Sequence, residues 1–378
     1  MTQVEQGVAN NVDVAELSPA LVIGTGLVGA SVGQALTRAG LRVHLSDRVH
    51  SHAQVAASRG AGTTDAPVAE QVKLVVVAVP PQALAATISA ALDDYPAATV
   101  TDVGSVKGAV VAALRATGKD LSRYVGSHPM AGSQRVGPMT ASAELFVDRT
   151  WVVTPHDTAA AQAVLAVNKV AELCGARRVS MGPAHHDEAV AQVSHLPHLV
   201  SVLVAERLTD LPAEHLRLAG QGLRDVTRIA GSDPKLWQQI IAANAGAVRG
   251  ELEALRGHLD ELISAFDEAE AHPDAEVELS AILRRGQQGT RALPGKHGLN
   301  PVDYAQVVVE IPDAPGALSR LFVDIETAGV NVEDVRIDHD RELQRGWLSL
   351  QVIPDRAAEL AAALTNAGWS VPDHDPQL

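Results

Sequence analysis

The chain has 378 residues, which is enough for two or three domains with sizeable buried cores. Its 46% hydrophobic and 20% charged residues are typical of a soluble globular protein, and its net charge of −15 argues against nucleic acid or an anionic membrane as a partner. The single cysteine, Cys174, excludes an internal disulfide and fits a reducing compartment.

Residues 1–18 are polar and lack periodicity, so we expect them to form a loose tail. They do not show the basic segment followed by an apolar core that marks a secretory signal. No apolar run reaches the roughly 18–20 residues needed to span a bilayer. We therefore expect a cytoplasmic protein without a membrane partner.

A strand, a glycine-rich turn and a helix follow one another from residue 20. Residues 20–23 are apolar and indicate a buried strand, and the helix ends near Gly40. The turn between them reads Gly24-Thr25-Gly26-Leu27-Val28-Gly29. A second strand, residues 41–46, leads to Asp47, 18 residues after Gly29. In this setting the glycine motif predicts a dinucleotide-binding unit, the alternative being a glycine-rich turn of some other α/β protein.

The residues of this unit have distinct expected roles. Gly24 permits the tight turn, Gly26 lets a pyrophosphate approach the backbone, and Gly29 lets the helix pack on the strand. The phosphates would lie at the helix N-terminus, where N–H groups and the helix dipole favour anions. Asp47 would accept hydrogen bonds from the adenosine ribose and repel a 2′-phosphate, which favours NAD over NADP. Arg48 could weaken that preference.

Further strands alternate with helices up to about residue 181. Residues 74–79 form an apolar strand suited to a parallel sheet, and a helix from Gln82 to about Leu92 leads to a strand at residues 99–103. Strands at residues 151–154 and 177–181 flank a helix at residues 158–174. Ser105 follows the strand at 99–103, in the run Asp102-Val103-Gly104-Ser105-Val106-Lys107. Because ligands bind beyond the carboxyl ends of such strands, Ser105 could reach a ligand; it could also be a helix N-cap.

A strand near residues 124–125 delivers the run Gly126-Ser127-His128-Pro129-Met130-Ala131-Gly132-Ser133-Gln134. We expect a loop here, because small residues and proline let the backbone turn tightly and approach a ligand closely. Histidine is the side chain most easily set up as a base near neutral pH. A lone histidine is more often structural, but the neighbouring motifs favour His128 as a base between a cofactor and an anionic substrate.

Helical periodicity replaces strand signals from about Pro183 to residue 292. One long helix, residues 184–208, carries His195 and His198, and Pro197 should bend it. Two histidines at this spacing could share a metal ion, but we see no clear third ligand and expect none to be bound.

Arg228 is the strongest candidate to hold an anionic substrate, because its guanidinium group matches a carboxylate. A surface ion pair is the alternative. Trp237 should serve in packing, and it could also form the wall of a ring-shaped pocket. Residues 249–266 should form a long amphipathic helix, as expected of an interhelical or dimer surface, and His272-Pro273 should end it.

A β pattern returns after a linker at residues 293–303. Strands are expected at residues 305–311, 330–337, 347–353 and 369–371, and helices at residues 315–328 and 357–366. This βαββαβ order within roughly 70 residues predicts a ferredoxin-like module.

Taken together, these motifs resemble those of bacterial prephenate dehydrogenases, the enzymes of tyrosine biosynthesis, from about residue 20 onward. The remaining markers are Ser194-His195-Leu196-Pro197-His198 and Asp225-Val226-Thr227-Arg228-Ile229-Ala230. The C-terminal part of the chain resembles an ACT domain, a module that often binds amino acids as effectors. The resemblance lies in Asp313-Ala314-Pro315-Gly316-Ala317-Leu318 and Gly329-Val330-Asn331-Val332.

The resemblance implies a Rossmann domain at residues 19–182, an all-α dimerisation domain at 183–292 and an ACT-like domain at 304–378. It also implies a homodimer that converts prephenate to 4-hydroxyphenylpyruvate with NAD, with L-tyrosine as an effector bound near Asp313, Pro315, Gly316 and Asn331. His128 would be the base, near Ser105, and Arg228 would bind a carboxylate. The remaining pocket residues would be His198, Ser133, Gln134 and Trp237. Many relatives have Glu where this chain has Gln134.

Three other readings remain open. An arogenate dehydrogenase performs the same chemistry on a substrate with an amino group in place of the side-chain keto group. A β-hydroxyacid dehydrogenase also joins a Rossmann domain to a helical domain, but lacks the His-Pro and Thr-Arg-Ile-Ala motifs. A non-catalytic protein that senses NAD or an amino acid would not need His128, Ser105 and Arg228.

Overall fold

The computed structural model describes residues 12–132, 137–271, 276–293, 304–340 and 345–372. The chain divides into two compact units, residues 1–263 and 264–378. Within the described residues, none of the helices combines the length and apolar character needed to cross a membrane. The expected break at His272-Pro273 and most of the expected linker lie outside the described residues.

A seven-stranded sheet forms the centre of the first unit, in the order β2-β1-β3-β4-β5-β6-β7. The strands are β1 (Ala20–Ile23), β2 (Val43–Ser46), β3 (Leu74–Val77), β4 (Thr99–Asp102), β5 (Tyr124–Pro129), β6 (Thr150–Thr154) and β7 (Arg177–Ser180). The first five are parallel, and β6 pairs antiparallel with β5. This order places β2 and β3 on opposite sides of β1, so the direction in which successive strands are added to the sheet reverses at β1. Sheets of α/β proteins bind ligands at such a point.

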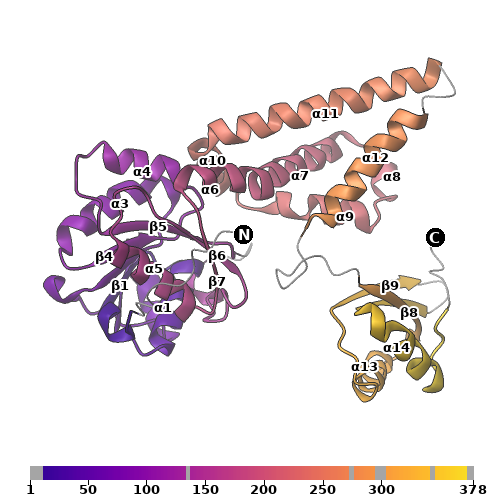
Figure 1. Ribbon diagram of the computed structural model, residues 1–378, viewed down its shortest axis with the longest axis horizontal. Helices are drawn as coiled ribbons and strands as arrows, with labels where there is room; N and C mark the ends of the chain where they lie inside the picture. The colour runs from indigo at the N-terminus through magenta and orange to yellow at the C-terminus, as the bar shows by residue number, and fades with distance from the viewer. Residues whose placement is uncertain (1–11, 133–136, 272–275, 294–303, 341–344, 373–378) are drawn as a thin grey trace, which may run out of the picture. The chain divides into compact units, whose positions relative to one another are not determined.

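Helices cover both faces of this sheet (Figure 1). Alternate residues of β1 pack to opposite sides: Val22 joins the core under α1, α2 and α5, and Leu21 joins the core under α3 and α4. These helices are α1 (Leu27–Arg38), α2 (His50–Ser58), α3 (Pro81–Asp94), α4 (Gly108–Arg115) and α5 (Ala161–Leu173). The predicted α/β domain with buried parallel strands is confirmed.

The expectation of a loose tail fails for the part of it that the structure describes. Residues Val14–Leu17 form a 3-10 helix (η1), which Asp13 and Glu16 cap through reciprocal hydrogen bonds. Leu17 is buried in the core of the first unit. Two buried apolar side chains, Val12 and Leu17, and a local capping pair therefore order this segment, although it shows no periodicity. Further 3-10 helices are η2 (Ala69–Gln71) and η3 (Pro138–Thr140).

Helices follow from Pro183, as predicted. They are α6 (Pro183–Val190), a π-helix η4 (Ala191–His195), α7 (Leu196–Arg207), η5 (Leu208–Asp210), α8 (Ala213–Leu216), α9 (Gln221–Thr227), η6 (Arg228–Gly231), α10 (Pro234–Ala243) and α11 (Ala245–Ala271). The single helix expected at residues 184–208 is thus interrupted by a π-helical stretch just before Pro197. Proline has no N–H to donate, and the wider turn accommodates the change in hydrogen bonding.

The second unit contains α12 (Glu276–Arg291) and a three-stranded antiparallel sheet in the order β8-β10-β9. Its elements are β8 (Ala305–Pro312), α13 (Ala317–Thr327), β9 (Asp334–Asp340), β10 (Arg345–Val352) and α14 (Pro354–Asn366). The final predicted strand is reduced to a single bridge between Ser370 and Glu310. The adjacent Trp369 is buried, and its Nε1 donates to Asp324 Oδ2 at 2.7 Å.

Candidate active site

His128 lies on a strand, and the prediction that it lies in a loop is wrong. Strand β5 continues to Pro129 because residues 126–129 pair with β6, and His128 stands opposite Val152. Antiparallel pairing fixes the backbone on one side of His128 and therefore the direction of its side chain. A rigid strand supports the candidate base better than the loop that the small residues suggested.

The imidazole of His128 is half-buried, and its Nδ1 lies 2.9 Å from Nε2 of His186. Loss of hydration lowers the pKa of His128 well below its ordinary value of 6.5. Electrostatic interactions with His186, Lys107 and His195 lower this pKa further. His128 is therefore a neutral imidazole at physiological pH, and it can accept a proton without first losing one.

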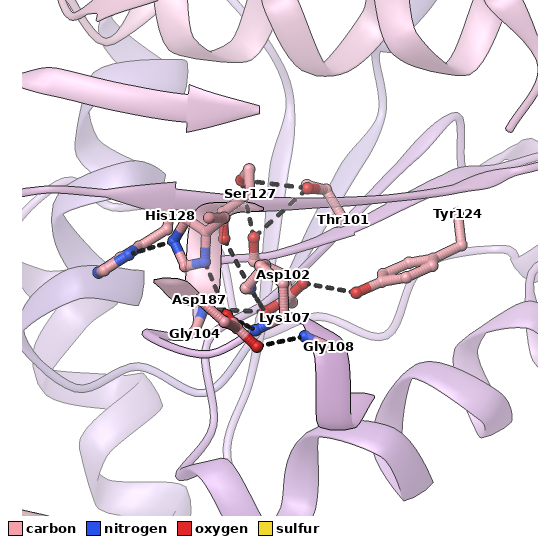
Figure 2. A network of polar contacts seen from close by, with 10 residues as sticks. Thr101, Asp102, Gly104, Lys107, Gly108, Tyr124, Ser127, His128 and Asp187 are labelled. Atoms are coloured by element: carbon pink, nitrogen blue, oxygen red, sulfur yellow. Dashed lines mark hydrogen bonds and ion pairs between the residues drawn. The ribbon is translucent and has the colours of Figure 1, made fainter. Parts of the chain in front are cut away.

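A fully buried ion pair lies beside this strand (Figure 2). Lys107 Nζ bonds to Asp102 Oδ2 and also donates to the carbonyl oxygen of Ser127 at 2.8 Å. The same carboxylate accepts from the Tyr124 hydroxyl and from the Gly104 N–H, each at 2.8 Å. Burial lowers the pKa of Lys107, and the Asp102 carboxylate opposes that shift. The pair thereby connects β4, β5 and the turn that leads into α4.

Asp187, on α6, holds the start of α4. Its Oδ1 accepts from the Lys107 N–H at 2.8 Å, and its Oδ2 accepts from the Gly108 N–H at 2.7 Å. A carboxylate at this position satisfies N–H groups that lack helical partners and meets the positive end of the helix dipole. Asn244 donates from Nδ2 to the Asp187 carbonyl at 2.8 Å. These contacts join the helical segment to the nucleotide-binding sheet.

Two histidines from the helices that follow Pro183 pack against Trp237. The ring of His198 stacks on it with centroids 3.5 Å apart and planes 5° apart, and His195 meets it edge-on at 6.1 Å. Burial lowers the pKa of His195 to about 4 and also lowers the pKa of His198. His195 Nδ1 lies 3.2 Å from Asn244 Nδ2 and is therefore the acceptor in that contact. Trp237 therefore packs with its flat face on His198, and its use as a pocket wall stays a prediction.

The glycine-rich turn has the steric properties that a bound dinucleotide requires. Gly24 has a φ of +94°, and a Cβ there would overlap the Ala78 carbonyl at the end of β3. A Cβ on Gly29 would overlap the Gly24 carbonyl oxygen. In contrast, a Cβ on Gly26 would meet nothing within 4 Å, and Gly26 is the N-cap of α1. The space at this helix N-terminus fits a pyrophosphate.

Asp47 organises this turn as well as the end of β2. Its Oδ2 accepts from the Thr25 N–H at 2.7 Å and from the Thr25 hydroxyl at 3.0 Å, and its Oδ1 accepts from the Val49 N–H at 2.8 Å. Each carboxylate oxygen has two lone pairs. These contacts therefore leave one acceptor position, on Oδ1, for a ribose hydroxyl. Arg48 is exposed beside it.

The other predicted site residues lie in several places. Ser105 lies in the bend after β4, and no hydrogen bond joins its hydroxyl to His128 in the described part of the chain. Arg228 begins η6, which packs against α7, the helix that carries His198. Ser133 and Gln134 lie outside the described residues.

The candidate effector residues surround turns of the second unit. Asp313, Pro315 and Gly316 are exposed between β8 and α13, and Gly316 has a φ of +87°. Asn331 donates from Nδ2 to Glu333 Oε1 at 2.6 Å, before β9.

Sequence reasoning missed the residues that hold the candidate base. Asp102 and Lys107 belong to a motif that was used only to place Ser105, and their five-residue separation across a turn was a usable signal. His186, Asp187 and Asn244 carried no local signal, because their partners are distant in the sequence.

Comparisons with known proteins agree on one family. The nucleotide-binding domain of prephenate dehydrogenase matches residues 32–180, and its dimerization domain matches residues 182–284. The probable prephenate dehydrogenase NovF of Streptomyces niveus is 34% identical over 361 residues, which cover 93% of this chain and 98% of that protein.

Solved structures with similar folds include two enzymes. Synechocystis arogenate dehydrogenase has a TM-score of 0.61 and 28% identity, covering 72% of this chain and 99% of that one. Prephenate dehydrogenase from Aquifex aeolicus, in complex with hydroxyphenyl propionate and NAD+, has a TM-score of 0.62 and 27% identity, covering 71% of this chain and 97% of that one.

The buried ion pair generates a prediction about stability. Lys107→Met leaves Asp102 buried without its cationic partner, which should cost about 3–5 kcal/mol. Calorimetry should show the unfolding midpoint of the first unit falling by about 6–20 °C, at roughly 2–4 °C per kcal/mol. The control is Lys119→Met, which removes the surface pair with Asp93 and should cost about 0–1 kcal/mol. Equal shifts in both variants would contradict the importance of the buried pair.

The contacts of Asp47 generate a prediction about cofactor choice. Asp47→Ser removes the charged acceptor, so the ratio of kcat/KM for NAD to that for NADP should fall by about ten- to a hundredfold. Adding Arg48→Ala should abolish whatever NADP activity the first change produces, if Arg48 meets the 2′-phosphate. Steady-state kinetics with both cofactors measures this ratio. A wild-type enzyme that uses NADP better than NAD would refute the assignment.

Proposed function

The chain belongs to the prephenate dehydrogenase family of NAD-dependent oxidoreductases, and on that premise we propose that it oxidises and decarboxylates prephenate to 4-hydroxyphenylpyruvate. The observation that carries this proposal is a neutral His128 on a rigid strand of the sheet that also carries the dinucleotide-binding turn. A base in this position suits a substrate that must lose a proton as it is oxidised.

Prephenate is a cyclohexadiene that carries a 4-hydroxyl, a ring carboxylate and a pyruvyl side chain. A bound NAD, held at the turn formed by residues 24–29, would supply the acceptor for the hydride that leaves C4. His128 takes the hydroxyl proton at Nε2, because its Nδ1 is occupied by His186. The C4 oxygen can then form a carbonyl group, and loss of the ring carboxylate as carbon dioxide makes the ring aromatic. Aromatisation provides the driving force for that loss.

The substrate is held from the helical side in this proposal. Arg228 binds a carboxylate, since its guanidinium group matches that shape and charge. The stacked pair of His198 and Trp237 presents a flat surface for the substrate ring. Additional polar contacts are assigned from the family resemblance to Ser105, Ser133 and Gln134.

Arogenate is the second candidate substrate, and the similarity to Synechocystis arogenate dehydrogenase favours testing it. Arogenate carries an ammonium group where prephenate has a keto oxygen. An ammonium removed from water needs an anionic partner, whereas a keto oxygen needs a hydrogen-bond donor. Gln134 supplies a donor and no charge, so we favour prephenate.

One assay tests this proposal. Purified full-length protein is mixed with NAD and either prephenate or arogenate, and reduced NAD and carbon dioxide are both measured. Turnover of prephenate with equal amounts of both products is expected. A protein that binds NAD but turns over neither substrate would instead be a sensor of NAD or of an amino acid.

The active form in this proposal is a homodimer. Leu259 and Ile263, four residues apart on one face of α11, are 52% and 51% exposed, an arrangement that suits burial against a second copy. The match of residues 182–284 to a dimerization domain supports the same assignment. Sedimentation of the purified protein measures it directly.

We also assign regulation to the C-terminal residues. The β8-β10-β9 sheet with α13 and α14 on a βαββα path is compatible with an ACT domain. By the resemblance, residues 304–378 bind L-tyrosine around the exposed turn at residues 313–316.

His128→Asn should fold, bind NAD and lose most of its turnover. Asn retains hydrogen bonding but cannot act as a base, and base catalysis typically contributes about 10²–10⁴-fold. Single-turnover and steady-state kinetics with prephenate measure the loss, and NAD titration checks the cofactor site. A variant that keeps more than about a tenth of the wild-type kcat would remove His128 from the mechanism.

Gln134→Glu should move specificity toward arogenate. The added carboxylate can pair with the arogenate ammonium, and each ~1.4 kcal/mol of differential interaction changes the kcat/KM ratio tenfold. The measurement is kcat/KM for both substrates in the wild type and the variant. Wild-type preference for arogenate would show that another carboxylate, such as Asp225, already performs this task.

Truncation after Gly298 should leave an active dimer that has lost the L-tyrosine site of the full-length chain. Isothermal titration calorimetry with L-tyrosine compares the full chain with the truncated one. Performing the titration with the active site saturated by 4-hydroxyphenylpyruvate removes competition there. Unchanged tyrosine binding after truncation would rule out a site in residues 304–378.

A further inference from the structure

Three side chains in successive hydrogen-bond contact connect the start of α4 to the candidate base. Asp187 Oδ1 lies 2.8 Å from Nδ1 of His186, and Nε2 of His186 lies 2.9 Å from Nδ1 of His128. The rings of the two histidines meet edge-on, with centroids 5.2 Å apart and planes at 70°. His186 is fully buried, so solvent does not compete for either ring nitrogen.

The backbone determines the direction of these hydrogen bonds. The N–H groups of Lys107 and Gly108 can only donate, and they point to the two oxygens of Asp187. A carboxylate held in this way at a helix N-terminus is an acceptor. His186 Nδ1 therefore donates to Asp187, and Nε2 of His186 is the ring nitrogen left to accept from His128.

The contact with His186 in turn determines the tautomer of His128. Since Nε2 of His186 is an acceptor, Nδ1 of His128 must carry the proton in the contact between them. The lone pair of neutral His128 is then on Nε2, the nitrogen that the proposed reaction uses. The reverse arrangement would place two unprotonated acceptors, His186 Nδ1 and Asp187 Oδ1, 2.8 Å apart, which is unfavourable.

We propose that His186 is a positioning residue that holds His128 in the tautomer with a free Nε2 lone pair, with Asp187 as its anchor. This inference deepens the proposed function and rests on it for its catalytic meaning. When His128 takes the substrate proton, the O–H bond breaks and an Nε2–H bond forms. The resulting positive charge is then linked through His186 to the Asp187 carboxylate.

The proposed reaction requires a neighbour that selects one tautomer of His128. A free imidazole populates both tautomers, and only one of them presents a lone pair to the substrate. Among the described residues, the other charged or titratable groups that influence the pKa of His128 are Lys107 and His195. The Lys107 ammonium donates its hydrogen bonds to Asp102 and to the Ser127 carbonyl oxygen. His195 contacts Asn244 and Trp237. In the described part of the chain, His186 is thus the side chain that accepts from His128 Nδ1.

The direct test is the protonation of the His128 ring in the full-length enzyme. Isotope-labelled histidine and long-range proton–nitrogen correlation spectra show which ring nitrogen carries the proton, and His128→Asn assigns the signals. The wild type should show a protonated Nδ1 and a free Nε2. His186→Leu, which offers no acceptor, should show mixed tautomers, and His186→Gln, whose Oε1 can accept, should restore the wild-type pattern. His185→Leu, an exposed neighbour on α6, is the matched control.

Kinetics provides the second readout. His186→Leu should lower kcat by about ten- to a hundredfold, the loss expected for one hydrogen bond to a group that becomes charged, with little change in KM for prephenate or NAD. His186→Gln should recover most of that loss, and His185→Leu should match the wild type. NAD titration and thermal unfolding of each variant separate a folding defect from a catalytic one.

Three outcomes would overturn the inference. These are an unchanged tautomer of His128 in His186→Leu, a wild-type His128 protonated at Nε2, or equal losses of kcat in His186→Leu and His186→Gln. The spectra need no substrate. They decide the inference even if the wild type turns over neither prephenate nor arogenate, which is the separate failure of the proposed function.

Discussion

The turn that begins helix α4 is held by two carboxylates from different parts of the chain, and the candidate site depends on it. Asp102, at the end of β4, pairs with the Lys107 side chain, and Asp187, on α6, accepts from the Lys107 and Gly108 backbone. Both carboxylates are desolvated, so each requires its donors and tolerates little displacement. Through these contacts the sheet, α4 and the helical segment share one geometry, and His128 lies within it.

This arrangement reconciles a strongly acidic chain with the anionic substrate that we propose. The net charge of −15 repels anions overall. Around the candidate base, however, Lys107 and backbone donors occupy the carboxylates, and burial lowers the pKa of His128 and His195. The proposed substrate therefore meets a neutral base. In the proposed function Arg228, which begins η6, binds the negative charge of that substrate.

Local patterns predicted most of the first unit and part of its site. The glycine motif identified the turn, and the structure explains each glycine by a carbonyl oxygen that excludes a Cβ or by open space at a helix N-terminus. The apolar strands and the onset of helices at Pro183 were also predicted. The prediction of a loop at His128 failed, because small residues permit a turn but do not require one when a neighbouring strand, β6, offers hydrogen bonds. The prediction of a loose N-terminal tail failed for the described residues 12–18, because Val12 and Leu17 are buried.

The sequence by itself determined the α/β class, the dinucleotide-binding turn with Asp47, and the identity of His128 as the candidate base. These features depend on residues that are close in the chain, where backbone sterics and side-chain periodicity act locally. Only the tertiary structure decided which groups surround that base. His186 is 58 residues from His128, and Asp187 is 80 residues from Lys107. Contacts of such range arise from the packing of whole elements, which leaves no pattern in either stretch of sequence.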